Sequence, residues 1–222
     1  MARTALDEVD LVILTMSKTI VDNADYFAQL DAVAGDGDFG YSLRNGFEVV
    51  LADYDTFDRS TIGTTLKRVG FVIAGKVGGV SGPIWGTAFL RAAATAGDKT
   101  ELTSTELIEI LRAAIEGIMQ RGEASLGDKT LLDALVPAVD SLEQSLAAGV
   151  TDDGVAAIQD AADVAVKAGE ETLGMLAMRG RAAYTGERSR DSVDAGATAI
   201  GVILQAVSAA WREAHTEQEI EP

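Results

Sequence analysis

Apolar residues recur along most of this chain at the spacing of an α-helix. In residues 9–20 the apolar side chains fall three or four positions apart, and the same spacing returns in residues 107–119 and 200–211. A repeat near the helical period of about 3.6 residues places such side chains on one face of a helix. No segment alternates apolar and polar residues as a half-buried strand does. The pattern therefore predicts an all-α protein.

The periodic segments divide the chain into eight predicted helices. Thr103 and Glu106 form a capping-box pattern, which marks a helix start near residue 104. The predicted helices span residues 5–30, 41–54, 60–76, 83–96, 104–121, 131–147, 153–177 and 195–215. Long helices joined by short links favour antiparallel packing of neighbours. We therefore expect a single domain over residues 1–222, built as a bundle or closed barrel of eight antiparallel helices.

The links between these helices carry most of the glycine clusters and unusual polar residues. Four of them join the first predicted helix to the second, the third to the fourth, the fifth to the sixth and the seventh to the eighth. They are residues 35–40, 78–82, 122–130 and 180–196. Alternate links of an antiparallel bundle lie at the same end. The four links are thus expected to converge on one face, and an active site is predicted there.

Composition narrows the possible classes of function. The 222 residues are 47% hydrophobic and include no cysteine and one histidine, His215. This composition indicates a globular protein and excludes disulfides, thiolate metal sites and histidine-rich metal centres. The N-terminus lacks a signal-peptide pattern, and no apolar run reaches the roughly 18 residues that a membrane span needs. These observations predict a cytoplasmic protein.

The formal net charge of −17 bears on the partners of the protein. Such a charge repels nucleic acid and anionic membranes, so neither is expected as a partner. It also repels a free nucleotide, so a nucleotide ligand would need bound metal to offset the local negative charge. The charge is equally accounted for by solubility alone.

Three aspartates close together are the strongest local signal. Asp31, Asp36 and Asp38 are separated mainly by glycine and alanine. Carboxylates this close repel one another unless a cation lies between them, and hard cations such as Mg²⁺ prefer carboxylate oxygens. We expect a Mg²⁺ site that serves a nucleotide. A solvated acidic turn between two helices is the alternative that these residues alone leave open.

The sequence partly matches three known binding motifs, and each match fails at a required feature. Residues 35–40 match the glycines of a dinucleotide fingerprint, but that motif needs a preceding strand and here a helix precedes. Residues 122–130 nearly match a phosphate-binding P-loop, but Asp128 separates the glycine from the lysine. A calcium-binding EF-hand that starts at Asp36 would need glutamate at its twelfth position, which is Phe47. All three interpretations are rejected.

The remaining link features are compatible with phosphate binding. Thr130 can cap a helix whose N-terminal amides favour anions. The 78–82 loop, with Pro83 in the first turn of the next helix, either cradles phosphate through its amides or serves close helix packing, and both stay open. The 180–196 link concentrates arginines in an acidic protein, and arginines commonly clamp polyphosphates. They are Arg181, Arg188 and Arg190.

Taken together, these links resemble a known family. The chain is similar over essentially its full length to the nucleotide-binding L subunit of dihydroxyacetone kinases. The matching stretches, in chain order, are Leu30–Gly40, Val77–Thr87, Gly127–Asp133 and Gly180–Gly196. The resemblance implies a barrel of eight antiparallel helices with a nucleotide bound at one end.

The resemblance also implies a set of site residues. Two Mg²⁺ ions would bridge the phosphates of ATP or ADP to Asp31, Asp36 and Asp38. Contacts to phosphates and nucleoside would come from Phe39, Gly40, Tyr41, Ser42, Val80, Ser81, Gly122, Thr130, Leu131, Arg181, Asp194, Ala195 and Gly196. Leu131 would face the adenine, and Arg181 is the candidate catalytic residue because it would orient the phosphates together with the Ser81 loop.

Two positions depart from the family pattern. The family usually has histidine where this chain has Phe39, and it often has asparagine where this chain has Ser42. Both positions would lie beside the phosphates. The affinity for the nucleotide, or the preferred phosphoryl donor, is therefore expected to differ from that of other members.

The implied activity is phosphoryl transfer to a hydroxyl of a short ketose, with dihydroxyacetone as the default and erythrulose as an alternative. In the family the sugar is held through a histidine on a separate subunit or domain, so a sugar-binding kinase subunit is the expected partner. The donor is either ATP or a retained ADP that a phosphohistidine carrier protein recharges, and the sequence leaves both open. Three further alternatives are a nucleotide-loaded regulatory module, the ATP-binding part of a fatty-acid kinase, and a plain helical scaffold.

Overall fold

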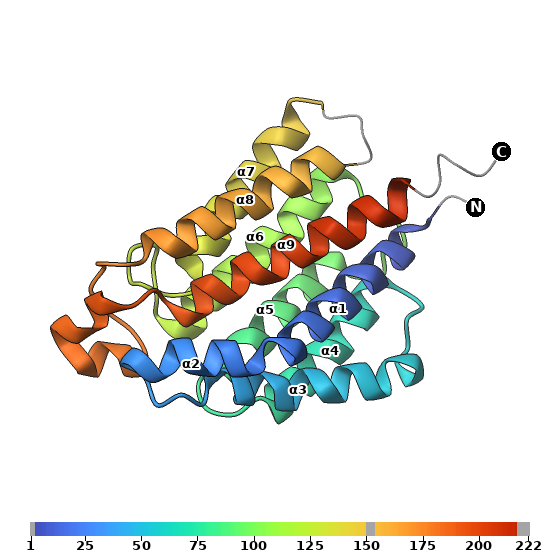
Figure 1. The fold of residues 1–222 in the computed structure, drawn as a ribbon. Helices are drawn as coiled ribbons and strands as arrows, with labels where there is room; N and C mark the ends of the chain where they lie inside the picture. The colour runs from blue at the N-terminus through green and yellow to red at the C-terminus, as the bar shows by residue number, and fades with distance from the viewer. Residues whose placement is uncertain (1–2, 150–153, 217–222) are drawn as a thin grey trace.

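The computed structural model describes residues 3–149 and 154–216, and within these ranges the regular secondary structure is entirely helical (Figure 1). The α-helices are α1 (Ala5–Asp22), α2 (Ala24–Ala34), α3 (Phe39–Asp53), α4 (Ile62–Lys76), α5 (Ser81–Ala96), α6 (Ser104–Gly122), α7 (Leu132–Ala147), α8 (Val155–Glu171) and α9 (Ala195–Thr216). Two 3₁₀ segments are η1 (Tyr54–Thr56) and η2 (Arg181–Asp191). The all-α prediction is confirmed, and the predicted count of eight helices is wrong because the described residues form nine.

The helix predicted over residues 5–30 is interrupted at Asn23. This residue separates α1 from α2 with φ −103° and ψ 11°. Its side-chain amide donates a hydrogen bond to the Thr19 carbonyl at 2.8 Å. Asparagine competes with the backbone for hydrogen bonds in this way, and it therefore favours helix ends over helix interiors. The apolar period continues through both helices, which is why the sequence pattern does not show the break.

The helix predicted over residues 153–177 ends earlier than expected. Residue 153 lies outside the described residues, and α8 ends at Glu171. The Thr172 hydroxyl donates to the Gly169 carbonyl at 2.6 Å, and Gly174 has φ +83°, a conformation that glycine adopts readily. The chain thus leaves the helix before the 3₁₀ turns of η2 begin.

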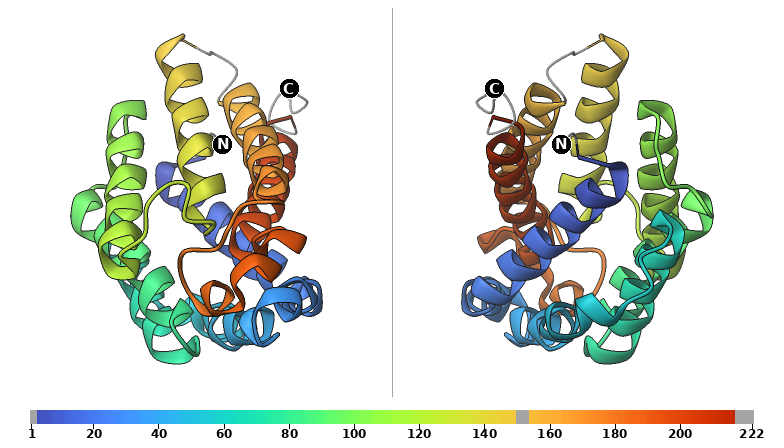
Figure 2. Two further views of the ribbon diagram at one scale, coloured as in Figure 1. Left: turned by 90° about the vertical axis from the view of Figure 1, so that its left-hand side faces the viewer. Right: turned by 90° about the vertical axis from the view of Figure 1, so that its right-hand side faces the viewer.

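The helices pack mainly against their neighbours in chain order. From α3 to α9 each helix contacts the next one, while α1 contacts both α3 and α9 (Figure 2). The core between them includes the fully buried side chains of Leu43, Phe47 and Ile73. The Phe47 ring meets Trp85 edge-on, with centroids 6.1 Å apart. Burying a side chain of this size stabilises the fold by about 1.5–3 kcal/mol, so the core holds early and late helices in a fixed relation.

Four links gather at one end of the molecule, as the antiparallel arrangement predicts. We call residues 35–38, 77–80, 123–131 and 172–194 the four-link end. It lies at the left of Figure 1 and faces the viewer in the left view of Figure 2. Contacts join the links directly, since Lys129 Nζ donates to the Ser192 carbonyl at 2.6 Å and Arg181 pairs with Asp38. The break at Asn23 does not disturb this arrangement, because it adds a helix without reversing the chain.

In the part of the chain that the structure describes, no single helix combines the length and apolar character of a membrane span. Only η2 and α9 taken together meet those criteria, and their axes are bent by 79°.

Candidate functional site

Three carboxylates meet at the four-link end. Asp31 lies in the last turn of α2, and Asp36 and Asp38 lie in the link that leads to α3. One carboxylate oxygen from each residue comes within 4.8 Å of those of the other two. We call these residues the aspartate trio. The structure thus brings together the acidic residues that the sequence singled out.

The backbone around the aspartate trio is fixed by a tight turn. The Gly37 amide donates to Asp31 Oδ2 at 2.8 Å. Gly37 has φ +75°, in the left-handed region that favours glycine. The turn folds the link back onto α2, so that the carboxylates of Asp36 and Asp38 reach that of Asp31.

Arg181 is the cation that faces the aspartate trio. It is the first residue of η2, and its side chain is half-exposed. Its Nη1 lies 3.0 Å from Asp38 Oδ2 and also contacts Asp36 Oδ2. The sequence placed these residues in two separate links, and their pairing brings η2 to the end of α2. One guanidinium group offsets only part of the charge of three carboxylates.

The donor set of the aspartate trio fits a hard divalent cation. All three ligand groups are carboxylates, the class of oxygen donor that Mg²⁺ prefers. Burial, together with the charge of Asp31, raises the pKa of the Asp38 carboxyl. A raised carboxyl pKa means that the negative charge is not fully compensated, and a bound cation would remove that cost. Within residues 3–149 and 154–216, no other three acidic or histidine side chains gather so closely.

Four helices begin around this site. The first turns of α3, α5, α7 and α9 follow the four links, so their N-terminal amides lie at the four-link end. Helix N-termini carry partial positive charge and unsatisfied N–H groups, and both features favour anions. The residues predicted to contact the nucleotide occupy these helix starts, apart from Gly122 at the end of α6 and Arg181 in η2. An anion at this end would therefore meet amides from several directions.

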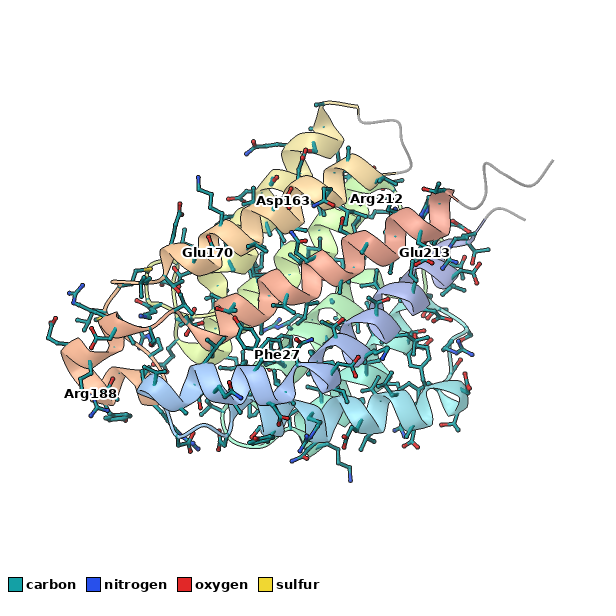
Figure 3. The ribbon with its side chains drawn as sticks, in the orientation of Figure 1. Phe27, Asp163, Glu170, Arg188, Arg212 and Glu213 are labelled. Atoms are coloured by element: carbon teal, nitrogen blue, oxygen red, sulfur yellow. The ribbon has the colours of Figure 1, made fainter. Side chains whose placement is uncertain are left out.

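The first turn of α3 carries four of the predicted contact residues. Phe39 packs against the core, with its ring centroid 6.4 Å from that of Phe27, which is labelled in Figure 3. Tyr41 is 43% exposed and lies under the Arg44 guanidinium, while Ser42 approaches Gly78 in the neighbouring link. Phe39 is thus part of the core. At this position the chain has an apolar packing contact where the family usually has the imidazole of a histidine.

Gly40 has a packing role of its own. A Cβ added there would lie 1.9 Å from the Ala24 carbonyl oxygen of α2. No side chain fits at that distance, so α2 and α3 approach this closely only because the residue is glycine. The packing accounts for this glycine independently of any ligand.

The start of α5 combines an exposed loop with close helix packing. Val80 is 65% exposed just before Ser81, and Gly79 has φ +60°. A Cβ at Gly82 would lie 2.3 Å from the Val77 carbonyl oxygen, so the loop turns too tightly for any other residue. Close packing, one of the two interpretations of the 78–82 loop, is thus present. The close packing does not move the backbone amides at the start of α5 away from the four-link end, so phosphate binding by these amides stays open.

The starts of α7 and α9 lie side by side. The Thr130 hydroxyl accepts from the Leu132 amide at 3.2 Å, but the N-cap of α7 is Leu131, so Thr130 lies one residue before the cap position predicted for it. Asp194 caps α9, since its Oδ1 accepts from the Ala197 amide at 2.7 Å. Gly196 lies against Leu131, which joins the two helix starts. Burial raises the pKa of the Asp194 carboxyl to about 7, so this cap carries only part of a negative charge near neutral pH.

The three arginines of the fourth link have different surroundings. Only Arg181 meets the aspartate trio. Arg190 donates to Glu187 Oε2 at 2.7 Å and to the Gly174 carbonyl at 2.6 Å, so it stabilises the link itself. Arg188 is exposed on the outer side of η2 (Figure 3). Of the three arginines in this link, Arg181 alone was predicted as a site residue, and it is the one that contacts the aspartate trio.

Lys129 and Asp133 are buried polar residues of the matching stretch Gly127–Asp133 to which the sequence analysis assigned no role. Both oxygens of Asp133 accept backbone hydrogen bonds, from Gly127 at 2.6 Å and from Thr130 at 2.7 Å. Lys129 has φ +61° and is only 3% exposed. The P-loop pattern of residues 122–130 includes this lysine, and its rejection leaves Lys129 without a predicted role. Only its distant contacts, which a local pattern does not reveal, show its place in the fold.

Comparison with known proteins finds one matching family model and several similar kinase subunits. A family model described as the DAK2 domain matches residues 33–209. The chain is 37% identical over 190 residues to the ADP-binding subunit DhaL of the PEP-dependent dihydroxyacetone kinase of Escherichia coli (strain K12), covering 86% of this chain and 90% of that protein. It is 34% identical over 208 residues to the L-erythrulose 1-kinase of Mycolicibacterium smegmatis (strain ATCC 700084 / mc(2)155), of which it covers only 36%.

The fold is also found in solved structures. The native dihydroxyacetone kinase of C. freundii superimposes with a TM-score of 0.71 over 94% of this chain and 35% of that one. The same kinase in complex with AMP-PNP and Mg²⁺ gives a TM-score of 0.69. Sequence identity is 23% in both cases, so this likeness concerns the fold alone.

Proposed function

Because the chain belongs to the DAK2 domain family, we propose that it is the nucleotide-binding subunit of a two-component kinase that phosphorylates a short ketose. The observation that carries this proposal is the aspartate trio, whose ligand oxygens lie within 4.8 Å of one another at the end where four helices begin. The names of its relatives support the same function, since several are ADP-binding subunits of dihydroxyacetone kinases.

In this proposal Asp31, Asp36 and Asp38 hold two Mg²⁺ ions, which neutralise the phosphates of the bound nucleotide. Arg181 and the amides at the start of α5, near Ser81, orient those phosphates. Phosphoryl transfer depends mainly on such positioning and charge neutralisation. The contacts predicted at Phe39–Ser42, Val80, Gly122, Thr130, Leu131 and Asp194–Gly196 complete the site. Their places at the starts and ends of helices around the trio support this assignment.

The finer features of the function rest on the relatives. Their names include PEP-dependent and PTS-dependent kinases with an ADP-binding subunit, which favours a retained ADP that a phosphohistidine carrier protein recharges. Dihydroxyacetone is the ketose that we propose, supported by the names of the subunit relatives, and erythrulose is the alternative, since erythrulose kinases are similar to this chain over about a third of their length. We also propose that the circuit of packed helices is a closed barrel, in which α1 and α2 together form one of eight antiparallel members.

Calorimetric titration with ADP tests the site directly. We expect binding in the presence of Mg²⁺ and none above background when EDTA replaces the metal, because the aspartate trio repels bare phosphates. At ADP concentrations about 100 times the Kd, the free energy of unfolding should rise by about 2.7 kcal/mol. Thermal melting with and without the two ligands checks that figure. Equal binding with and without Mg²⁺ would contradict the metal-bridged site.

The proposed need for a partner has its own test. The purified chain, mixed with ATP, Mg²⁺ and dihydroxyacetone, should give no turnover above the buffer control, because a sugar site is expected on a separate subunit. Addition of the sugar-binding subunit of a dihydroxyacetone kinase should start phosphorylation, measured as the appearance of the sugar phosphate. Robust turnover by the chain alone would refute the half-enzyme proposal.

A further inference from the structure

The segment that carries Arg181 has little apolar packing of its own. We call residues 175–192 the arginine segment. Most of its residues are exposed, and Tyr184 is 93% exposed. The 3₁₀ turns within it are interrupted at Gly186, which has φ +59°. Short 3₁₀ turns have poorer hydrogen bonds than an α-helix, so a contact from elsewhere must hold the segment in place.

Lys129 supplies that contact from the neighbouring link. Its Nζ donates to the carbonyl of Met175 at 3.2 Å, to that of Ser192 at 2.6 Å and to that of Ser189. Met175 lies at the start of the arginine segment, and the other two acceptors lie at its end. One ammonium group thus joins both ends of the segment, and all three of its N–H donors are used.

The position of Lys129 makes this contact difficult to replace. The residue is buried, and burial lowers the pKa of its ammonium, although the carboxylates of Asp194 and Asp191 favour the charged form. Carbonyl oxygens left without this donor would be buried polar groups without a partner, which is costly in the folded state. Two further contacts attach the same two links: the Met178 amide donates to the Asp128 carbonyl at 3.0 Å, and Arg179 forms a weaker surface pair with the Asp128 carboxylate, 3.1 Å apart.

The two parts of the site differ in their dependence on Lys129. The aspartate trio belongs to α2 and the link to α3, which Lys129 does not contact. Arg181 and the cap of α9 at Asp194 lie within or directly after the arginine segment. Loosening the segment should therefore displace the phosphate-orienting groups and leave the carboxylates where they are.

We propose that Lys129 is a positioning residue, which holds the arginine segment closed so that Arg181 and the start of α9 face the bound nucleotide. This inference rests on the proposed nucleotide site and adds a residue that does not touch the ligand. It predicts opposite responses for metal and nucleotide. In the free protein Arg181 occupies part of the trio, so releasing it should leave metal binding equal or tighter while nucleotide binding weakens.

The test compares Lys129→Met with the control Lys167→Met. Both replace a lysine by a side chain of similar length, but Lys167 is exposed on α8 and only pairs with Glu171 at 3.7 Å. Mn²⁺ binding without nucleotide is measured by electron paramagnetic resonance, and ADP binding with Mg²⁺ by calorimetry. We expect Lys129→Met to weaken ADP binding by about 10- to 100-fold, a loss of the size found when residues that orient metal ligands are replaced. Its affinity for Mn²⁺ should equal or exceed that of the wild type, and Lys167→Met should match the wild type in both.

Limited trypsin digestion locates the change. Cleavage after Arg181, Arg188 and Arg190 should be faster in Lys129→Met than in Lys167→Met, because the arginine segment is released locally. Lys129→Gln, which keeps an amide donor but forms fewer hydrogen bonds, is made in parallel and should lose less affinity for ADP. If Lys129→Met does not fold, the Gln variant decides, and if neither folds the proposal is overturned.

Each remaining outcome is decisive. Wild-type affinity for ADP in Lys129→Met overturns the proposal, and so does an equal loss of Mn²⁺ and ADP binding, which would indicate a general structural role. If the wild type itself binds neither Mn²⁺ nor ADP, the proposed function fails instead. The two failures are thus distinguished by the wild-type titration alone.

Discussion

Replacing Asp36 with asparagine is expected to weaken Mg²⁺-dependent ADP binding by about 100-fold or more. Loss of residues that merely support metal ligands already costs about 10- to 100-fold, and Asp36 is a proposed ligand itself. Asparagine keeps the shape of the side chain and removes its negative charge, so the loss would report on electrostatics and not on packing. The measurement is calorimetric titration with ADP at a fixed, saturating concentration of Mg²⁺. In the presence of a sugar-binding subunit, phosphoryl transfer should be lost as well.

Asp25→Asn is the matched control for this substitution. Asp25 is exposed in the first turn of α2, the helix that also carries Asp31, so the net charge changes equally while the aspartate trio stays intact. Its affinity for ADP should remain within about twofold of the wild type. If both variants lose the same affinity, the overall charge of the protein matters and the trio is not a specific site. If Asp36→Asn binds normally, the proposed metal ligands are wrong.

Replacing Gly40 with alanine is expected to lower the free energy of unfolding by about 3 kcal/mol or to prevent folding. Adding atoms to a well-packed core typically costs about 1–3 kcal/mol, and the geometry here is at the severe end. The added Cβ would lie 1.9 Å from the Ala24 carbonyl oxygen and 2.8 Å from the Ala28 amide nitrogen. Both atoms belong to the backbone of α2, so no side-chain rotation relieves the contact. Urea unfolding followed by far-UV circular dichroism measures the loss.

Gly75→Ala is the control, because it makes the same chemical change where there is room. Gly75 lies in α4, and a Cβ added there would meet nothing within 4 Å. Alanine in an exposed helix is favoured over glycine by about 0.5–1 kcal/mol, so this variant should be more stable than the wild type. A Gly40→Ala protein as stable as the wild type would mean that α2 and α3 separate more easily than their packing indicates.

Sequence signals predicted a helix boundary well where a few neighbouring residues both carry the signal and form the structure. The Thr103–Glu106 capping box is formed as predicted, with the Glu106 amide 3.2 Å from the Thr103 hydroxyl and α6 starting at Ser104. The break at Asn23 was missed because the apolar period runs through it without a change of phase. A single asparagine is a weak signal, and only its hydrogen bond to Thr19 distinguishes it from a solvent-facing residue.

In the candidate site too, contacts between residues close in the sequence were predicted, and contacts between distant residues were predicted less well. Asp31, Asp36 and Asp38 lie close together in the sequence, so their approach in space follows from one turn. The pairing of Arg181 with Asp38 joins residues far apart in the chain, and it was expected only in outline, from the counting of antiparallel links. The role of Lys129 depends on three backbone carbonyls in another link, and no pattern of neighbouring residues predicts which carbonyls a buried lysine will reach.

The contact between α1 and α9 has a practical consequence for handling the protein. His215 Nε2, near the end of α9, lies 3.4 Å from Glu8 Oε1 in the first turn of α1, so the two helices meet at the end opposite the four links. Within the described residues α1 begins and α9 ends here, and surface positions of this kind generally accept attached groups. A fluorophore or an affinity tag attached near the start of α1 or the end of α9 should therefore leave the four-link end accessible. A protein immobilised through this end would expose the aspartate trio at the four-link end to ligands in solution.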